Sequence, residues 1–209
     1  MILYKTVMEE AEAEQTIEKS RFISHIKPVT SKEAAEEFIA EIRASYKTAT
    51  HNVPAFVIGN KMQLQWASDD GEPQGTSGAP IVQMLVKEGI TNVAVVVTRY
   101  FGGIKLGTGG LVRAYTSSAK LALEAAGIAD VREMLVLEVR MAYSYLAKMK
   151  NLAGEFFSVE NISYTDSIVM QLSTEPENEE RLKAFLADMT AGSARIISEK
   201  VEFVKVRVI

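Results

Sequence analysis

Two glycine-rich segments contain most of the residues of this chain that could do chemistry. Nine of its 13 glycines lie between Gly71 and Gly110, and eight of these nine lie in two segments that span residues 69–78 and 99–110. Glycine costs backbone entropy and adds no packing, so this density indicates a backbone that adopts positive φ or approaches another group closely. The same segments contain clustered charges, and charge beside a flexible backbone is typical of a binding or catalytic loop.

The second segment has the layout of an anion-binding site. The apolar residues 93–97 predict a buried strand, the glycines follow it, and a helical pattern begins after them. The N–H groups and the positive dipole end of a helix N-terminus favour an anion, to which Arg99, Lys105 and Arg113 would add charge. Thr108 would cap the helix or contact a bound oxygen. The segment matches neither a Walker A loop nor a dinucleotide fingerprint.

A structural interpretation of the same glycines stays open, in which the loop packs tightly against the first segment. The two aromatic residues of the loop would stack on a base, or equally anchor the loop to the core. His51, before a predicted strand, would be a hydrogen bonder in a pocket or a structural histidine. The predicted binding residues are Arg99, Tyr100, Phe101, Gly102, Gly103, Lys105, Gly107, Thr108, Gly109, Gly110, Arg113 and His51.

The first segment carries three acidic residues, Asp69, Asp70 and Glu72. Their carboxylates could hold Mg²⁺, since hard cations prefer oxygen ligands, but one short acidic run lacks the distributed ligands of a dedicated site. They could also form turns, cap a helix, or pair with Arg99 and Lys105. We favour ion pairing, and we predict no metal and no cofactor.

Catalysis has little support elsewhere in the sequence. The chain has no cysteine, which excludes disulfides, thiolate metal sites and a cysteine nucleophile. Its two histidines, His25 and His51, lie in settings that do not suggest a shared metal. Ser77 lies in a motif that resembles the nucleophile elbow of hydrolases without matching it, and no strand leads directly into it. We therefore predict no catalytic residue.

The composition is that of a globular protein. Of the 209 residues, 47% are apolar and 24% are charged. The net charge of −4 divides evenly between residues 1–130 and 131–209, so nucleic-acid binding would need a local basic patch, and nothing indicates DNA in particular. The first residues lack the features of a signal peptide and no apolar run reaches bilayer length, which predicts a cytoplasmic protein that does not associate with membranes.

The segments around these loops predict an α+β chain with two domains, spanning residues 1–130 and 131–209. In the first, strands are predicted within 4–29 and at 53–58, 62–66 and 93–97, with helices after a Thr30–Glu33 capping box, at 80–87, and from Leu111 to Gly127. In the second, the order is strand 134–140, helix 143–153, strands 158–164 and 168–173, helix 177–190 and strand 195–208. This βαββαβ order is the ferredoxin-like pattern.

Three ordered motifs of the first domain resemble the signature of the YigZ/IMPACT family. They are Ala49-Thr50-His51-Asn52, Asp69-Asp70-Gly71-Glu72-Pro73 followed by Gly75-Thr76, and the stretch from Arg99-Tyr100-Phe101-Gly102-Gly103 to Arg113-Ala114-Tyr115. The resemblance covers essentially the whole chain. It implies a ribosomal protein S5 domain 2-like fold for residues 1–130, which GHMP-type small-molecule kinases share, and a ferredoxin-like fold for residues 131–209.

The resemblance also implies a role near translation. Eukaryotic relatives restrain a starvation-responsive kinase by competing for its activator, and bacterial members have been suggested to bind nucleic acid or to act near the ribosome. We expect a non-enzymatic regulator that binds RNA, the translation machinery or a protein partner through the two loops. Two alternatives stay open: an enzyme acting on a nucleotide or small phosphorylated ligand at the same loops, and a pure protein-interaction module. A proline dipeptidase has no support, because two histidines and one acidic run give no dinuclear metal site.

Overall fold

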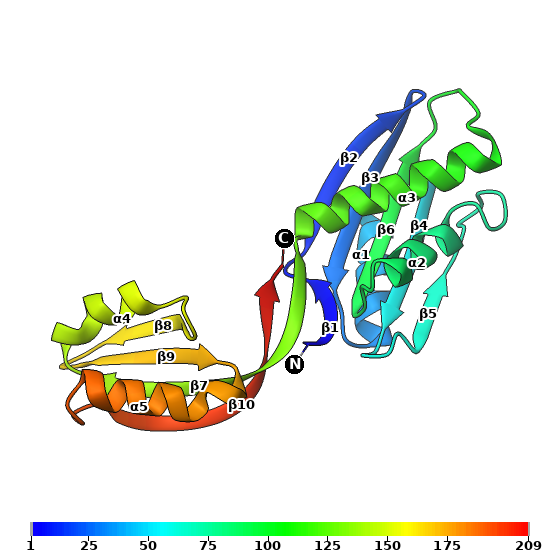
Figure 1. Cartoon of the computed structure of the whole chain (residues 1–209). Coiled ribbons are helices and arrows are strands. Elements are labelled where there is room, and N and C mark those ends of the chain that lie inside the picture. Colours follow the sequence, from blue (N-terminus) through cyan, green and yellow to red (C-terminus); the bar gives the residue numbers. More distant parts are fainter. Residues whose placement is uncertain (1, 209) are drawn as a thin grey trace. The chain divides into compact units, whose positions relative to one another are not determined.

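The computed structural model describes residues 2–208 and divides into two compact units. Residues 2–131 and 205–208 belong to the first unit, and residues 132–204 belong to the second. Each unit contains an antiparallel sheet and helices, so the chain is an α+β protein (Figure 1). The division lies beside the predicted one at residue 130, although residues 205–208 belong to the first unit.

The sheet of the first unit places its most buried strand at its centre. The strand order is β2 (Ala11–Ile17), β3 (Ser20–Pro28), β6 (Val93–Tyr100), β4 (His51–Ile58) and β5 (Leu64–Ala67), with antiparallel pairing throughout. β6 is buried from Val93 to Arg99, which confirms that this apolar run is a central strand covered on both faces. β1 (Ile2–Val7) pairs with β7 (Ile128–Met141), which begins in the first unit.

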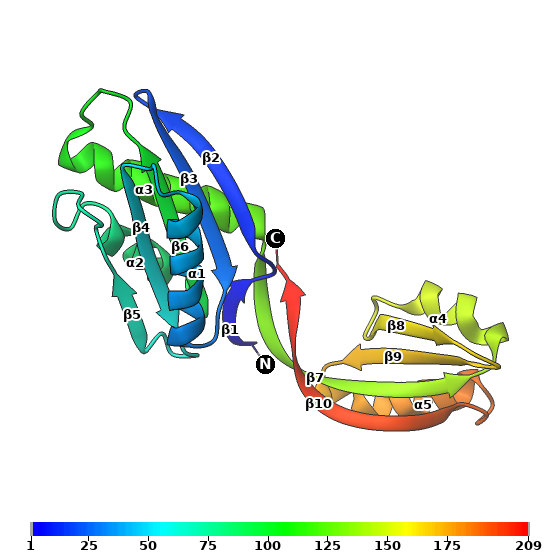
Figure 2. The same ribbon diagram turned by 180° about the vertical axis from the view of Figure 1, so that it is seen from behind.

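Helices cover both faces of this sheet (Figures 1 and 2). α1 (Lys32–Ser45) lies on one face, where its apolar stripe of Ala35, Phe38, Ile39 and Ile42 packs against β4 and β6. α2 (Gly78–Lys87) and α3 (Gly107–Ala126) share the core of the other face. The two loops with the glycine-rich segments connect β5 to α2 and β6 to α3.

The residues predicted to cap α1 and α3 do not cap these helices. Ser31, rather than Thr30, caps α1, because the Ser31 Oγ accepts a hydrogen bond from the backbone N–H of Ala34 at 3.2 Å. α3 begins at Gly107, so Thr108 lies inside its first turn and forms no capping hydrogen bond. The glycines from Gly107 onward therefore belong to the helix and not to the loop.

The second unit has the predicted order of elements. β7 pairs with β9 (Ile168–Thr174) and with β10 (Arg195–Arg207), and β9 pairs with β8 (Ser158–Tyr164). The helices are α4 (Leu146–Leu152) and α5 (Glu179–Met189), and both contribute to one apolar core with the inward residues of β7 and β9. A short 3₁₀ turn precedes each helix, at Tyr143–Tyr145 and Pro176–Asn178, where the sequence predicted α-helix. None of the helices in residues 2–208 has the length and apolar character needed to cross a membrane.

Candidate functional site

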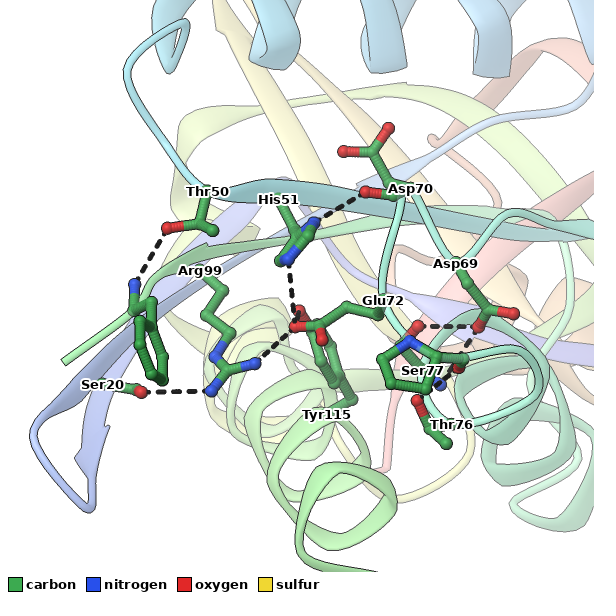
Figure 3. A network of polar contacts seen from close by, with 12 residues as sticks. Ser20, Thr50, His51, Asp69, Asp70, Glu72, Thr76, Ser77, Arg99 and Tyr115 are labelled. Carbon is green, nitrogen blue, oxygen red and sulfur yellow. Dashed lines mark hydrogen bonds and ion pairs between the residues drawn. The ribbon is translucent and has the colours of Figure 1, made fainter. Parts of the chain in front are cut away.

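A buried carboxylate joins three elements of the first unit (Figure 3). The Oε1 of Glu72, from the loop before α2, accepts hydrogen bonds from Arg99 Nη1 at 2.6 Å and from the Tyr115 hydroxyl at 2.7 Å. Arg99 is the second-to-last residue of β6 and Tyr115 lies in α3, and all three residues are buried. One carboxylate therefore ties the first glycine-rich segment to the central strand and to the helix that follows the second segment.

The Arg99 guanidinium has several further contacts inside the protein. Its Nη2 donates to Ser20 Oγ at 3.3 Å, and the same hydroxyl oxygen accepts the backbone N–H of Gly102 at 3.2 Å. The guanidinium carbon lies 5.4 Å from the ring centres of both Phe22 and Phe101. The guanidinium is therefore held by two aromatic rings and one carboxylate, and through Ser20 and Phe101 it stabilises the start of the loop between β6 and α3.

This position corrects the role predicted for Arg99. We expected its charge to contact phosphate, but the residue is 4% exposed and the Glu72 carboxylate already neutralises it. The preference for ion pairing was right for Glu72 and Arg99. It was wrong for Lys105, which forms no ion pair with any residue of the described range.

Gly102 shows that the structural interpretation of the glycines holds at one position. A Cβ atom there would lie 2.0 Å from the backbone carbon and oxygen of Lys19, in the turn between β2 and β3. No side chain fits at that distance, so the second segment packs against this turn. The partner differs from the one we expected, which was the first glycine-rich segment.

His51 and Tyr115 complete the network around Glu72. The Nδ1 of His51 is 2.7 Å from the backbone carbonyl oxygen of Asp70, and since a carbonyl only accepts, Nδ1 carries the hydrogen. Its Nε2 then faces Glu72 Oε1 at 3.8 Å. Burial, with the hydrogen bond to the Glu72 carboxylate, raises the pKa of the Tyr115 hydroxyl above its ordinary range. Tyr115 therefore remains a neutral donor.

The other two acids of the first segment act within the protein. Asp69 accepts hydrogen bonds from the backbone N–H groups of Gly75, Ser77 and Gly78 and from the Ser77 hydroxyl, which satisfies the start of α2. Burial opposes ionisation of Asp69, but these hydrogen bonds outweigh it and lower the pKa of its carboxyl group.

Asp70 adopts a positive φ of 50° and bonds through both carboxylate oxygens. Its Oδ1 accepts from Arg43 at 2.8 Å, and its Oδ2 accepts from the backbone N–H of Asn52 at 2.7 Å. Within residues 2–208, no group of three or more acidic or histidine side chains is arranged to hold a metal ion. The carboxylate of Asp69 thus caps the start of α2, that of Asp70 links the loop to Arg43 and to the backbone of Asn52, and that of Glu72 forms the ion pair with Arg99.

A second set of predicted residues lies at the surface. Lys105 and Arg113 are exposed and line a hollow of about 450 Å³ beside the first turn of α3, together with Glu18 and the apolar side chains of Ile17, Ile104 and Leu106. Phe101 is 47% exposed and Tyr100 is half-buried. Gly103, Gly107, Thr108 and Gly109 are exposed and Gly110 is half-buried. The predicted binding residues therefore fall into two groups. Arg99 and His51 belong to a buried support around Glu72, whereas Lys105, Arg113 and Phe101 lie on an exposed face.

Sequence reasoning missed three residues that complete the support: Tyr115, Ser20 and Arg43. Tyr115 was named only as the last residue of the third signature motif, although a buried tyrosine needs a partner for its hydroxyl group and so signals a polar neighbour. Ser20 and Arg43 carry no such signal, because their partners Arg99 and Asp70 are distant in the sequence.

The fold and the site define a two-domain α+β protein in which a buried polar network holds two glycine-rich loops. The chain belongs to the IMPACT family. The Impact N-terminal domain matches residues 18–123, and a domain of unknown function (DUF1949) matches residues 139–193.

The relatives match most of the chain. It is 39% identical over 194 residues to IMPACT family member YvyE of Bacillus subtilis, covering 92% of this chain and 89% of that protein. It is 33% identical over 197 residues to IMPACT family member YigZ of Escherichia coli, covering 92% and 93%. A crystal structure of a hypothetical protein matches 99% of this chain and 98% of its own, with a TM-score of 0.58 and 28% identity.

Proposed function

We propose that this protein is a non-enzymatic regulator that acts with the translation machinery and binds RNA phosphate at the first turn of α3. The observation that carries the proposal is the hollow beside that turn, where Lys105 and Arg113 place two cations against one acid, Glu18. Neither cation has an ion-pair partner in residues 2–208, so both charges are available to a ligand. The link to translation rests on what the family resemblance implies.

The first turn of α3 adds neutral donors to these charges. The backbone N–H groups of Gly107, Thr108 and Gly109 have no partner within the helix, because the first N–H groups of any helix lack one. Such a turn favours an anion through these donors and through the helix dipole. The exposed ring of Phe101 supplies a surface on which an unpaired base can stack.

The finer fold classes belong to the same proposal. We infer that the first unit is S5 domain 2-like and that the second is ferredoxin-like. The pairing of the second unit supports its class, because β7 lies beside β9 and β10, β9 lies beside β8, and both helices pack on one core.

Binding of a fluorescent single-stranded RNA, followed by anisotropy at several salt concentrations, tests the proposal. We expect K105A and R113A each to weaken binding by about threefold or more and to reduce the dependence on salt, since each removes a phosphate contact. K61A removes an exposed lysine from the loop between β4 and β5 and should leave the affinity unchanged. RNA affinity that is unchanged in both K105A and R113A contradicts the mechanism.

A pull-down from cell extract, with and without nuclease treatment, separates RNA from protein partners. Partners lost on nuclease treatment support the proposal, whereas partners that persist favour the protein-interaction module. The nucleotide enzyme would need a carboxylate free to position Mg²⁺, but those of Asp69, Asp70 and Glu72 each accept at least two hydrogen bonds from the protein. We therefore expect no thermal stabilisation by ATP with Mg²⁺.

A further inference from the structure

The outer edge of β10 is open to another strand. β10 pairs with β7, and no other strand in residues 2–208 pairs with it. A free edge presents unpaired N–H and C=O groups that can extend the sheet into a second chain, so proteins commonly keep such edges short or cover them. β10 has 13 residues, which makes it a long edge to leave uncovered.

Large apolar side chains follow one face of this edge. Ile197, Val201 and Phe203 are 46%, 55% and 65% exposed, and Phe203 is the most exposed large apolar residue of the described range. Their odd numbers place them on the same face of the strand, because side chains alternate between faces. Single exposed apolar residues are ordinary, but a row of them on a free edge indicates an interface.

We propose that β10 pairs with β10 of a second copy, antiparallel and centred on Val201. In this register Lys200 lies opposite Glu202 of the second copy, and the two-fold symmetry repeats the pair. Opposite charges directly across two strands stabilise their pairing. Phe203 lies opposite Glu199 of the second copy and diagonal to its Ile197 and Val201, so the exposed apolar row meets its own equivalent.

The charges select this register over its neighbours. Centring the pair on Lys200 places two lysines opposite each other, and centring it on Glu202 places two glutamates opposite each other, which destabilises both alternatives. Between Ser198 and Val204 the proposed register brings no like charges face to face. Arg195 and Arg207, at the two ends of β10, would lie opposite each other, so the pairing that we propose covers residues 198–204. This self-complementarity is the reason to assign the edge to a second copy and not to an unrelated strand.

The charged side chains are placed to form ion pairs with the second copy. Lys200 and Glu202 are 46% and 43% exposed and pair with each other within one strand at 2.7 Å, so each can turn to the second copy. Glu199 pairs with Lys183 of α5 at 2.8 Å, which keeps its carboxylate away from the edge.

Sedimentation equilibrium of the full chain over a wide concentration range tests the proposal through a charge swap. We expect the wild type to dimerise, and K200E and E202K each to raise the dimer dissociation constant by about tenfold or more, since both ion pairs become like-charge pairs. Mixing the two single variants should restore the dimer as a heterodimer. The double variant K200E/E202K should dimerise like the wild type, because it exchanges the charges and keeps them opposite.

An apolar variant adds a second measurement. F203S should weaken the dimer, whereas Y164S, which changes a 58% exposed tyrosine on β8 of the same unit, should not. Circular dichroism establishes that each variant is folded. A wild type that stays monomeric at every concentration overturns the proposal, and so does a dimer whose dissociation constant neither single charge reversal changes.

Discussion

The buried pair of Glu72 and Arg99 should contribute far more to stability than the surface pairs of the same unit. We expect E72Q, which keeps the shape of the side chain and removes its charge, to reduce the free energy of unfolding by about 3 kcal/mol. The matched control is E14Q, because Glu14 pairs with Arg21 at the surface with a similarly short contact of 2.7 Å.

The expected magnitudes follow from burial. The side chains of Arg99 and Glu72 are 5% and 4% exposed, so the charge left on Arg99 in E72Q has no counter-ion and little water. Removing one member of such a pair costs about 3–5 kcal/mol, and the lower end applies because the amide oxygen can still accept from Arg99 and Tyr115. Arg21 and Glu14 are 52% and 42% exposed, so water and salt screen their interaction, and breaking this pair should cost far less than breaking the buried pair.

Urea unfolding followed by tryptophan fluorescence measures both costs. Trp66 is the one tryptophan of the chain and lies in β5, where its ring stacks on Phe56 at 5.4 Å, so it reports on the first unit. With a slope of about 2 kcal/mol per molar urea, E72Q should lower the midpoint by about 1.5 M at unchanged slope. A loss in E72Q no larger than that in E14Q would refute the assignment of Glu72 as a buried support.

Two further predictions use the same assay. G102A should reduce the free energy of unfolding by about 2 kcal/mol or more, because its new Cβ meets the backbone of Lys19. G109A is the control, since the nearest atom to its new Cβ is 3.8 Å away, and it should leave the free energy of unfolding unchanged or raise it slightly. Equal reductions in the two variants would contradict close packing at Gly102. Burial lowers the pKa of His25 below its ordinary value of 6.5, and this effect outweighs the opposite effect of the nearby glutamates Glu12 and Glu10. As the pH falls, His25 is therefore protonated in the unfolded chain before it is protonated in the folded protein. The contribution of neutral His25 to the free energy of unfolding is therefore fully present above about pH 6.5 and falls below that pH. In H25Q, urea midpoints measured over a series of pH values should no longer show this fall. A fall that persists in H25Q would show that other groups cause it.

Much of the fold is readable from the sequence, because it follows from periodicity. The apolar run at 93–97 indicated a strand covered on both faces, and helices on both faces of the sheet cover β6. The helical spacing of the apolar residues from Ala35 to Ile42 is itself enough to tell which side of α1 is buried. Patterns of this kind depend only on neighbours along the chain, so one sequence is enough to find them.

The site was only partly predictable, because its contacts join residues far apart in the sequence. Glycine density and charge located both loops, yet they could not show that Arg99 points inward while Lys105 stays exposed. That difference depends on Tyr115 and Ser20, which approach Arg99 and Glu72 only when α3 and β3 are in place. The start of α3 was misplaced because glycine disfavours helix, and packing of the helix on the sheet overrides that preference.

The residues of the signature motifs therefore have two roles that experiments can separate. Substitutions of Glu72, Arg99 or Tyr115 act on the fold, so any effect on RNA binding should follow the fraction of protein that remains folded. Substitutions of Lys105 or Arg113 act on an exposed face, so they should change RNA affinity while the urea midpoint stays constant. If R99A lowers RNA affinity without lowering the midpoint, Arg99 contacts the ligand directly, and the buried network would then have to open when RNA binds.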